Sequence, residues 1–152
     1  QASGTYGMVA GQMLDMKGEE RKLNLSELQL IHANKTGKLL TFPVVAAGIV
    51  ANLAADDLKS LREAGSLVGL AFQVRDDILD VTATFEEIGK TPKKDLLADK
   101  ATYPSLLGLE KSYDILNRSI DQVLAIFQKL SETQAFNAGK IIEMIERLRL
   151  HA

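Results

Sequence analysis

The longest regular feature of the sequence is an apolar stripe between Leu58 and Val81 that repeats with the period of an α-helix. Apart from one adjacent pair, its members follow one another at steps of three and four residues, which places them on one face of a helix. They are Leu58, Leu61, Ala64, Leu67, Val68, Ala71, Val74, Ile78 and Val81. Asp56 and Asp57 begin this helix, and we expect it to end at Asp80, with a separate helical turn between Thr84 and Gly89.

Similar stripes occupy residues 5–16, 26–52, 102–130 and about 136–150. We expect a capping box of Ser26 and Gln29 to start the second of these, and a kink near Gly37 and Pro43 to interrupt it. No stretch alternates with the period of a strand. The sequence therefore predicts an all-α fold in which residues 1–152 form a single all-helical unit.

Composition excludes several classes of partner. The chain carries 18 basic and 20 acidic residues, so its net charge of -2 gives no general attraction to nucleic acid or to an anionic membrane. It has no cysteine, hence no disulfide or zinc-thiolate site. The most apolar run, 39–55, is marginal in length and contains Pro43 and Asn52. We expect no nucleic acid partner, no stable insertion into a membrane, and a cytoplasmic location.

Three carboxylates, Asp76, Asp77 and Asp80, crowd the expected end of the central helix. Asp76 and Asp80 share a face, and Asp77 lies about a hundred degrees round the helix. Like charges so close together repel one another, so folding alone does not explain the cluster. A site for Mg²⁺, which keeps waters and takes further ligands from phosphate, does explain it. A solvated acidic helix end is the alternative.

Two segments that contain lysine are candidates for phosphate binding. Lys35 and Thr36 stand where the second helix is expected to be perturbed, and they offer an ammonium and a hydroxyl. A lysine-rich segment follows the acidic helix directly, and its glycine, threonine and proline indicate a loop. Its basic residues are Lys90, Lys93, Lys94 and Lys100. This order is expected where magnesium and a phosphate share one pocket, and a solvated loop is the alternative.

The N-terminal stripe adds a polar pair and a row of small residues. Gln12 and Asp15 lie three residues apart and point either into a site or into water. Gly4, Gly7 and Gly11 line one helical face. Because glycine costs helix stability, we expect this row to let another backbone pack closely.

Five of these signals occur together in a known order. They are Gly11-Gln12-x-x-Asp15, His32-x-x-Lys35-Thr36-Gly37, Gly69-x-Ala71-Phe72-Gln73-x-x-Asp76-Asp77-x-x-Asp80, Gly89-Lys90, and residues 99–109, Asp-Lys-Ala-Thr-Tyr-Pro-Ser-Leu-Leu-Gly-Leu. The set resembles the C-terminal half of the trans-isoprenyl diphosphate synthase family, most closely its bacterial farnesyl diphosphate synthases. The resemblance implies the C-terminal part of the isoprenoid synthase (terpenoid synthase) helical bundle.

The resemblance also implies an activity and roles for individual residues. A prenyltransferase of this family ionises an allylic diphosphate, adds the cation to isopentenyl diphosphate and loses a proton. It uses Mg²⁺, as three ions bridged by the substrate diphosphate. Asp76, Lys35 and Lys90 would then be catalytic, and Asp76, Asp77 and Asp80 would serve the metal. Substrate contacts would come from Lys35, Thr36, Gln73, Lys90 and Lys100, supported by Gln12 and Asp15. The resemblance further implies isoprenoid diphosphates as partners and a homodimer in the complete protein.

One part of the family pattern is absent from this sequence. The first aspartate-rich motif belongs to the family's N-terminal half, and Asp56-Asp57 lacks the downstream aspartate and the arginine pair that would replace it. Lys93 also stands where family members often carry glycine. We therefore expect the chain to be inactive alone, and to expose apolar helix faces and self-associate. A non-catalytic helical partner subunit, a diphosphate-binding protein and a terpene cyclase-like enzyme are the alternatives.

Overall fold

The computed structural model describes residues 1–18, 21–88, 101–134 and 136–150, with only the backbone described for 83–88. These ranges contain helices and no strand, which confirms the all-α prediction. Seven α-helices and one π-helical turn, η1, lie within them. Their bounds are α1 Met8–Gly18, α2 Leu25–His32, η1 Ala33–Gly37, α3 Lys38–Val50, α4 Ala55–Ile88, α6 Tyr103–Leu107, α7 Leu109–Gln134 and α8 Gly139–Glu146.

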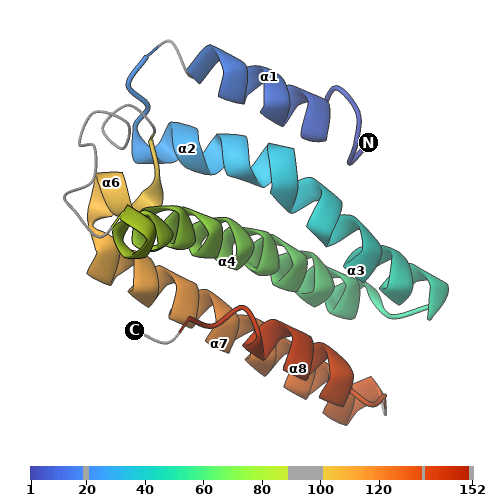
Figure 1. Cartoon of the computed structure of the whole chain (residues 1–152). Helices are drawn as coiled ribbons and strands as arrows, with labels where there is room; N and C mark the ends of the chain where they lie inside the picture. Colours follow the sequence, from blue (N-terminus) through green and yellow to red (C-terminus); the bar gives the residue numbers. More distant parts are fainter. Residues whose placement is uncertain (19–20, 89–100, 135, 151–152) are drawn as a thin grey trace.

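The helix α4 is the central element and packs mainly against α7 on one side and α3 on the other (Figure 1). The apolar stripe predicted for it forms the core, because Ala64, Val74 and Ile78 are fully buried. The facing residues Leu116 and Ile120 of α7 are fully buried as well. Burial along this one interface is what imposes the helical period on both stretches of sequence.

The prediction that the central helix ends at Asp80 is wrong. The helix α4 continues to Ile88, so the backbone shows no new helix start at Thr84. Thr82 is accommodated because its hydroxyl donates to the carbonyl of Ile78 at 2.9 Å, one turn back in the same helix. The acidic cluster therefore lies inside the helix, about two turns before its end.

The second predicted helix consists of three segments, α2, η1 and α3, that together form one bent rod beside α4 (Figure 1). The interruption predicted near Gly37 is present as the π turn: the Lys38 N–H donates to the carbonyl of Ala33, five residues back. Pro43 lies inside α3 without ending it. A π turn within a helix is frequently found at a functional site.

The capping box predicted for Ser26 and Gln29 is wrong, because the same spacing two residues earlier is used instead. The Asn24 side chain accepts from the Glu27 N–H, and the Glu27 carboxylate accepts from the Asn24 N–H, both at 3.0 Å. Arg21 adds an ion pair to Glu27 at 2.6 Å. The backbone hydrogen bond and Arg21 lower the pKa of Glu27 below 4.5.

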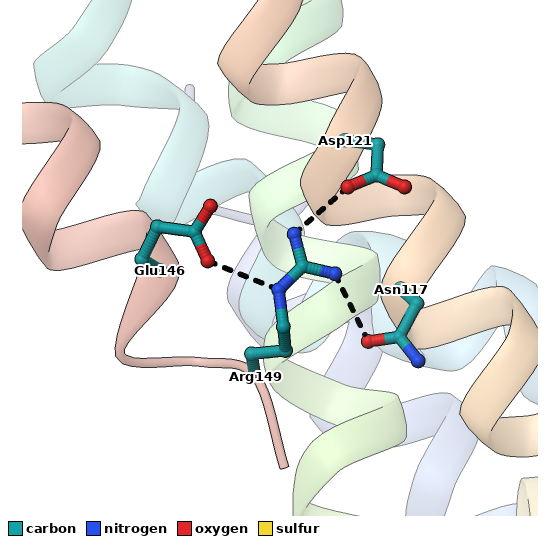
Figure 2. A network of polar contacts seen from close by, with 4 residues as sticks. All are labelled: Asn117, Asp121, Glu146 and Arg149. Carbon is teal, nitrogen blue, oxygen red and sulfur yellow. Dashed lines mark hydrogen bonds and ion pairs between the residues drawn. The ribbon is translucent and has the colours of Figure 1, made fainter. Parts of the chain in front are cut away.

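The C-terminal part contains one more break than the sequence predicted. Thr102 caps α6, and Gly108 then adopts φ +88° and separates α6 from α7. Beyond α8, Arg149 binds the chain to α7, as Figure 2 shows. Its guanidinium donates to Glu146 at 3.0 Å, to Asn117 at 3.1 Å and to Asp121 at 2.8 Å.

Large apolar side chains remain exposed on α1 and α3, as expected from the sequence. Phe42 is 62% and Val50 88% exposed. Met8, Leu39 and Phe72 are also exposed. Self-association through these faces stays a prediction. Within the described ranges, no helix combines the length and the hydropathy that crossing a membrane requires.

Candidate functional site

A cavity of about 810 Å³ lies between α1, the α2–η1 junction, α4 and α6. Most of its polar lining comes from residues that the sequence singled out, contributed by segments far apart in the chain. The lining residues are Gln12, Asp15, Gly18, Arg21, Lys22, Leu23, Leu28, His32, Lys35, Gln73, Asp76, Asp77, Asp80, Ala101, Ser105 and Leu106.

The π turn η1 is held between two glycines. A methyl group on Gly11 of α1 would lie 2.1 Å from the backbone nitrogen of Lys35, and one on Gly69 of α4 would lie 2.8 Å from the Cα of Gly37. Only residues without a side chain permit these approaches. The expectation that the N-terminal glycine row allows close backbone packing is thus confirmed at Gly11.

The two functional side chains of the π turn each have a defined partner. The ammonium of Lys35 donates to the carboxylate of Asp15 on α1 at 2.5 Å, and both side chains remain about one third exposed. The hydroxyl of Thr36 donates to the Gln73 side-chain carbonyl on α4 at 3.0 Å. Lys35 is therefore already held at the cavity wall, and Gln73 is fixed between η1 and α4.

The three aspartates of α4 are not equivalent. Asp76 and Asp80 are exposed and line the cavity. Asp77 also touches the cavity, but only 6% of its surface is exposed. Its carboxylate accepts from the backbone N–H of Tyr103 at 2.9 Å, which joins α4 to the first residue of α6.

The site suits a cation that retains water. Asp76 and Asp80 lie four residues apart on one face of α4 and line the same cavity as Lys35. In the described part of the chain, no three acidic or histidine side chains converge as a preformed metal cluster. The expectation that Asp76, Asp77 and Asp80 serve a metal stays a prediction, and the two exposed carboxylates among them are Asp76 and Asp80. One or two carboxylates are what Mg²⁺ uses when phosphate oxygens supply further ligands.

A second cavity, of about 710 Å³, lies between α2, η1, α3 and α4 and shares His32 with the first. Its lining is mainly apolar and includes Phe42, Leu70 and Tyr103. Tyr103 is fully buried, and its ring lies 5.8 Å from that of His32. Burial raises the pKa of Tyr103 to about 12, an effect that Gln29 opposes and Asp77 reinforces.

The first cavity brings together most of the site residues predicted from the sequence. Gln12, Asp15, Lys35 and Gln73 line it with the three aspartates, and Thr36 reaches it through its bond to Gln73. Lys90 and Lys100 lie outside the described residues.

Sequence reasoning missed Arg21 and Lys22, two cations at this cavity, and assigned them to a charged loop. It also gave no site role to His32. The position of Arg21 and Lys22 directly after the Asp15 helix was the available signal.

Comparisons with known proteins show to which family this chain is similar. The family model for polyprenyl synthetase matches residues 2–145. The chain is 49% identical over 136 residues to the farnesyl diphosphate synthase of Micrococcus luteus, covering 90% of this chain and 46% of that protein. It is 45% identical over 130 residues to the Bacillus subtilis farnesyl diphosphate synthase, covering 86% of this chain and 44% of that protein.

Solved structures give the same result. A crystal structure of a putative farnesyl-diphosphate synthase from Marinomonas sp. superposes with a TM-score of 0.79 at 30% identity, over 97% of this chain and 48% of the other. The Helicobacter pylori geranyltransferase complexed with magnesium and isoprenyl diphosphate superposes with a TM-score of 0.68 at 35% identity, over 86% of this chain and 43% of the other. The chain spans about half the length of these relatives. It belongs to the polyprenyl synthetase family.

Proposed function

We propose that this chain supplies one wall of a trans-prenyltransferase site, in which an allylic diphosphate condenses with isopentenyl diphosphate to form farnesyl or geranyl diphosphate. The observation that carries the proposal is the 810 Å³ cavity. In this chain of the polyprenyl synthetase family, the cavity brings the ammonium of Lys35 together with the exposed carboxylates of Asp76 and Asp80. Similarity to a geranyltransferase complexed with magnesium and isoprenyl diphosphate supports the same ligands here.

The chain's own residues bind and orient the diphosphate. The ammonium of Lys35 donates to a diphosphate oxygen, either in place of its hydrogen bond to Asp15 or in addition to it. This bond strengthens as the allylic C–O bond breaks, because negative charge then develops on the departing diphosphate. When bound to Asp76 and Asp80, Mg²⁺ supplies further positive charge that stabilises the leaving group. Lys90 and Lys100 are proposed as additional diphosphate contacts.

The contact between Thr36 and Gln73 has a different role. It fixes the Gln73 carboxamide at the cavity wall beside Asp76. We assign Gln73 to the substrate-binding wall of the cavity, where Thr36 holds its carboxamide in place. Gln12, which is exposed at the same cavity, supports this polar wall.

The proposal includes inactivity of the 152 residues alone, because the sequence has no first aspartate-rich motif. The test is incubation with Mg²⁺, dimethylallyl diphosphate and isopentenyl diphosphate, followed by detection of chain-elongated product. We expect no product from the chain alone, and product once the N-terminal half of a family member is added. Turnover by the chain alone would contradict the inactivity. A complemented sample that binds diphosphate but makes no product would favour the non-catalytic partner subunit.

The complemented sample also permits a test of individual residues. Asp76→Ala should lower turnover far more than Lys93→Ala, since only Asp76 is assigned to the metal. Equal effects of the two substitutions would argue against that assignment. A homodimer and a cytoplasmic location remain predictions for the complete protein.

A further inference from the structure

The middle aspartate of the acidic cluster has surroundings unlike those of its neighbours. Asp77 is 6% exposed, whereas Asp76 and Asp80 are both exposed. Its Oδ2 atom accepts from the backbone N–H of Tyr103, 26 positions later in the chain, at 2.9 Å. A buried carboxylate with a hydrogen bond to backbone is held in one orientation.

The partner of Asp77 is itself immobilised. Tyr103 begins α6 and is fully buried, with its ring packed near that of His32. Its N–H is one of the donors that a helix start cannot satisfy within the helix. Asp77 therefore fixes the start of α6 on α4.

The wall that α6 contributes matters for the cavity. Ala101, Ser105 and Leu106, which flank or belong to α6, line it together with Asp76 and Asp80. Loss of the Asp77 bond would release this wall and leave a buried N–H without its acceptor. The spacing of the wall from Asp76 and Asp80 depends on that bond.

We propose that Asp77 is a positioning residue: it holds α6 against α4 so that Asp76 and Asp80 face a cavity of fixed width, and it does not itself bind the metal. This inference rests on the proposed function, since it concerns the same magnesium and diphosphate site. The family resemblance leaves open whether Asp77 contacts the metal directly or only supports it, and this proposal assigns the supporting role.

The test compares asparagine and alanine at two positions. Asparagine keeps an oxygen that can accept from the Tyr103 N–H but loses the charge a metal ligand needs, and alanine loses both. Binding of inorganic diphosphate with Mg²⁺ to the 152-residue chain is measured by calorimetry. Hydrogen exchange of the Tyr103 amide is followed by NMR in the same variants.

For Asp77→Asn we expect a protected Tyr103 amide and near wild-type affinity. For Asp77→Ala we expect rapid exchange and affinity lower by about tenfold or more. Asp76→Asn and Asp76→Ala should both lose affinity while the Tyr103 amide stays protected. If Asp77→Asn loses affinity with a protected Tyr103 amide, Asp77 is a ligand and the proposal fails.

Two other outcomes also decide the question. Unchanged affinity in Asp77→Ala despite rapid exchange would overturn the positioning role, because the anchor, the hydrogen bond from the Tyr103 N–H to Asp77, would then have no effect on the site. If the wild-type chain binds no diphosphate, the proposed function fails. The anchor itself is judged separately, by whether Asp77→Ala exposes the Tyr103 amide.

Discussion

Replacing Gly11 by alanine tests the contact that positions Lys35. The added methyl carbon would lie 2.1 Å from the Lys35 backbone nitrogen and 2.5 Å from its Cα. Unstrained contacts between such atoms begin at roughly 3.5 Å, so α1 and η1 must separate by about 1 Å or more. Because the obstructing atoms are backbone, no side-chain rotation can relieve the collision.

The energetic consequence has two opposing parts. Alanine is preferred to glycine within a helix by about 1 kcal/mol. Overpacking against backbone costs about 1–3 kcal/mol. We therefore expect a net loss of stability of up to about 2 kcal/mol. Displacing Lys35 also weakens a charge-assisted hydrogen bond to diphosphate that is worth about 1.5–3 kcal/mol, so affinity should fall by roughly tenfold.

The assay combines urea unfolding with calorimetric titration of diphosphate and Mg²⁺. Gly4→Ala is the matched control, since its nearest neighbour, the carbonyl oxygen of Gln1, would lie 3.8 Å away at ordinary contact distance. We expect the control to behave like the wild-type chain. A Gly11→Ala variant with unchanged stability and affinity would refute the close approach of α1 and η1.

Three further predictions concern polar groups. Tyr103→Phe should change stability by about 1 kcal/mol or less in urea unfolding, because the buried hydroxyl makes no hydrogen bond of standard geometry among the described residues and loses only its weaker interaction with Gln29; a clearly larger loss would contradict this. Arg149→Ala should lower stability by about 1 kcal/mol or less, with the deficit shrinking at high salt, because its ion pairs are at the surface; a deficit independent of salt would contradict this. Since the pKa of Glu27 is lowered on folding, the ionised carboxylate stabilises the folded state above pH 4.5, and this stabilisation is lost as the pH falls below that value. Acid titration of Glu27→Gln should accordingly show a shallower loss of stability than the wild-type chain, and an identical profile would exclude the effect.

The helical architecture was predictable because burial imposes its period directly on the sequence. The stripes of α4 and α7 correspond to the faces that meet in the core, and Val74 and Ile120 are fully buried there. Helix ends were less predictable. Asn24 with Glu27 and Ser26 with Gln29 have the same spacing, and only the surrounding contacts favour the first pair.

The site was predictable as a set of residues and not as a geometry. Most residues of the family motifs that the structure describes line one cavity, but the spacing of three aspartates does not reveal which is buried. That depends on Tyr103, which lies 26 positions later in the chain. The π turn likewise packs against Gly11 and Gly69, which come from two other helices. Tertiary contacts of this kind leave no local signal in the sequence.

The central claim is that this chain binds diphosphate through Mg²⁺ held by Asp76, next to Lys35. Calorimetric titration of inorganic diphosphate into the chain, with and without Mg²⁺, tests it directly. We predict binding that depends on Mg²⁺ and is lost in Asp76→Ala. It should persist in Asp114→Ala, which removes an exposed carboxylate on α7 that lies outside the cavity lining. Binding that is unaffected by Mg²⁺, or equally weakened by the two substitutions, would contradict the account.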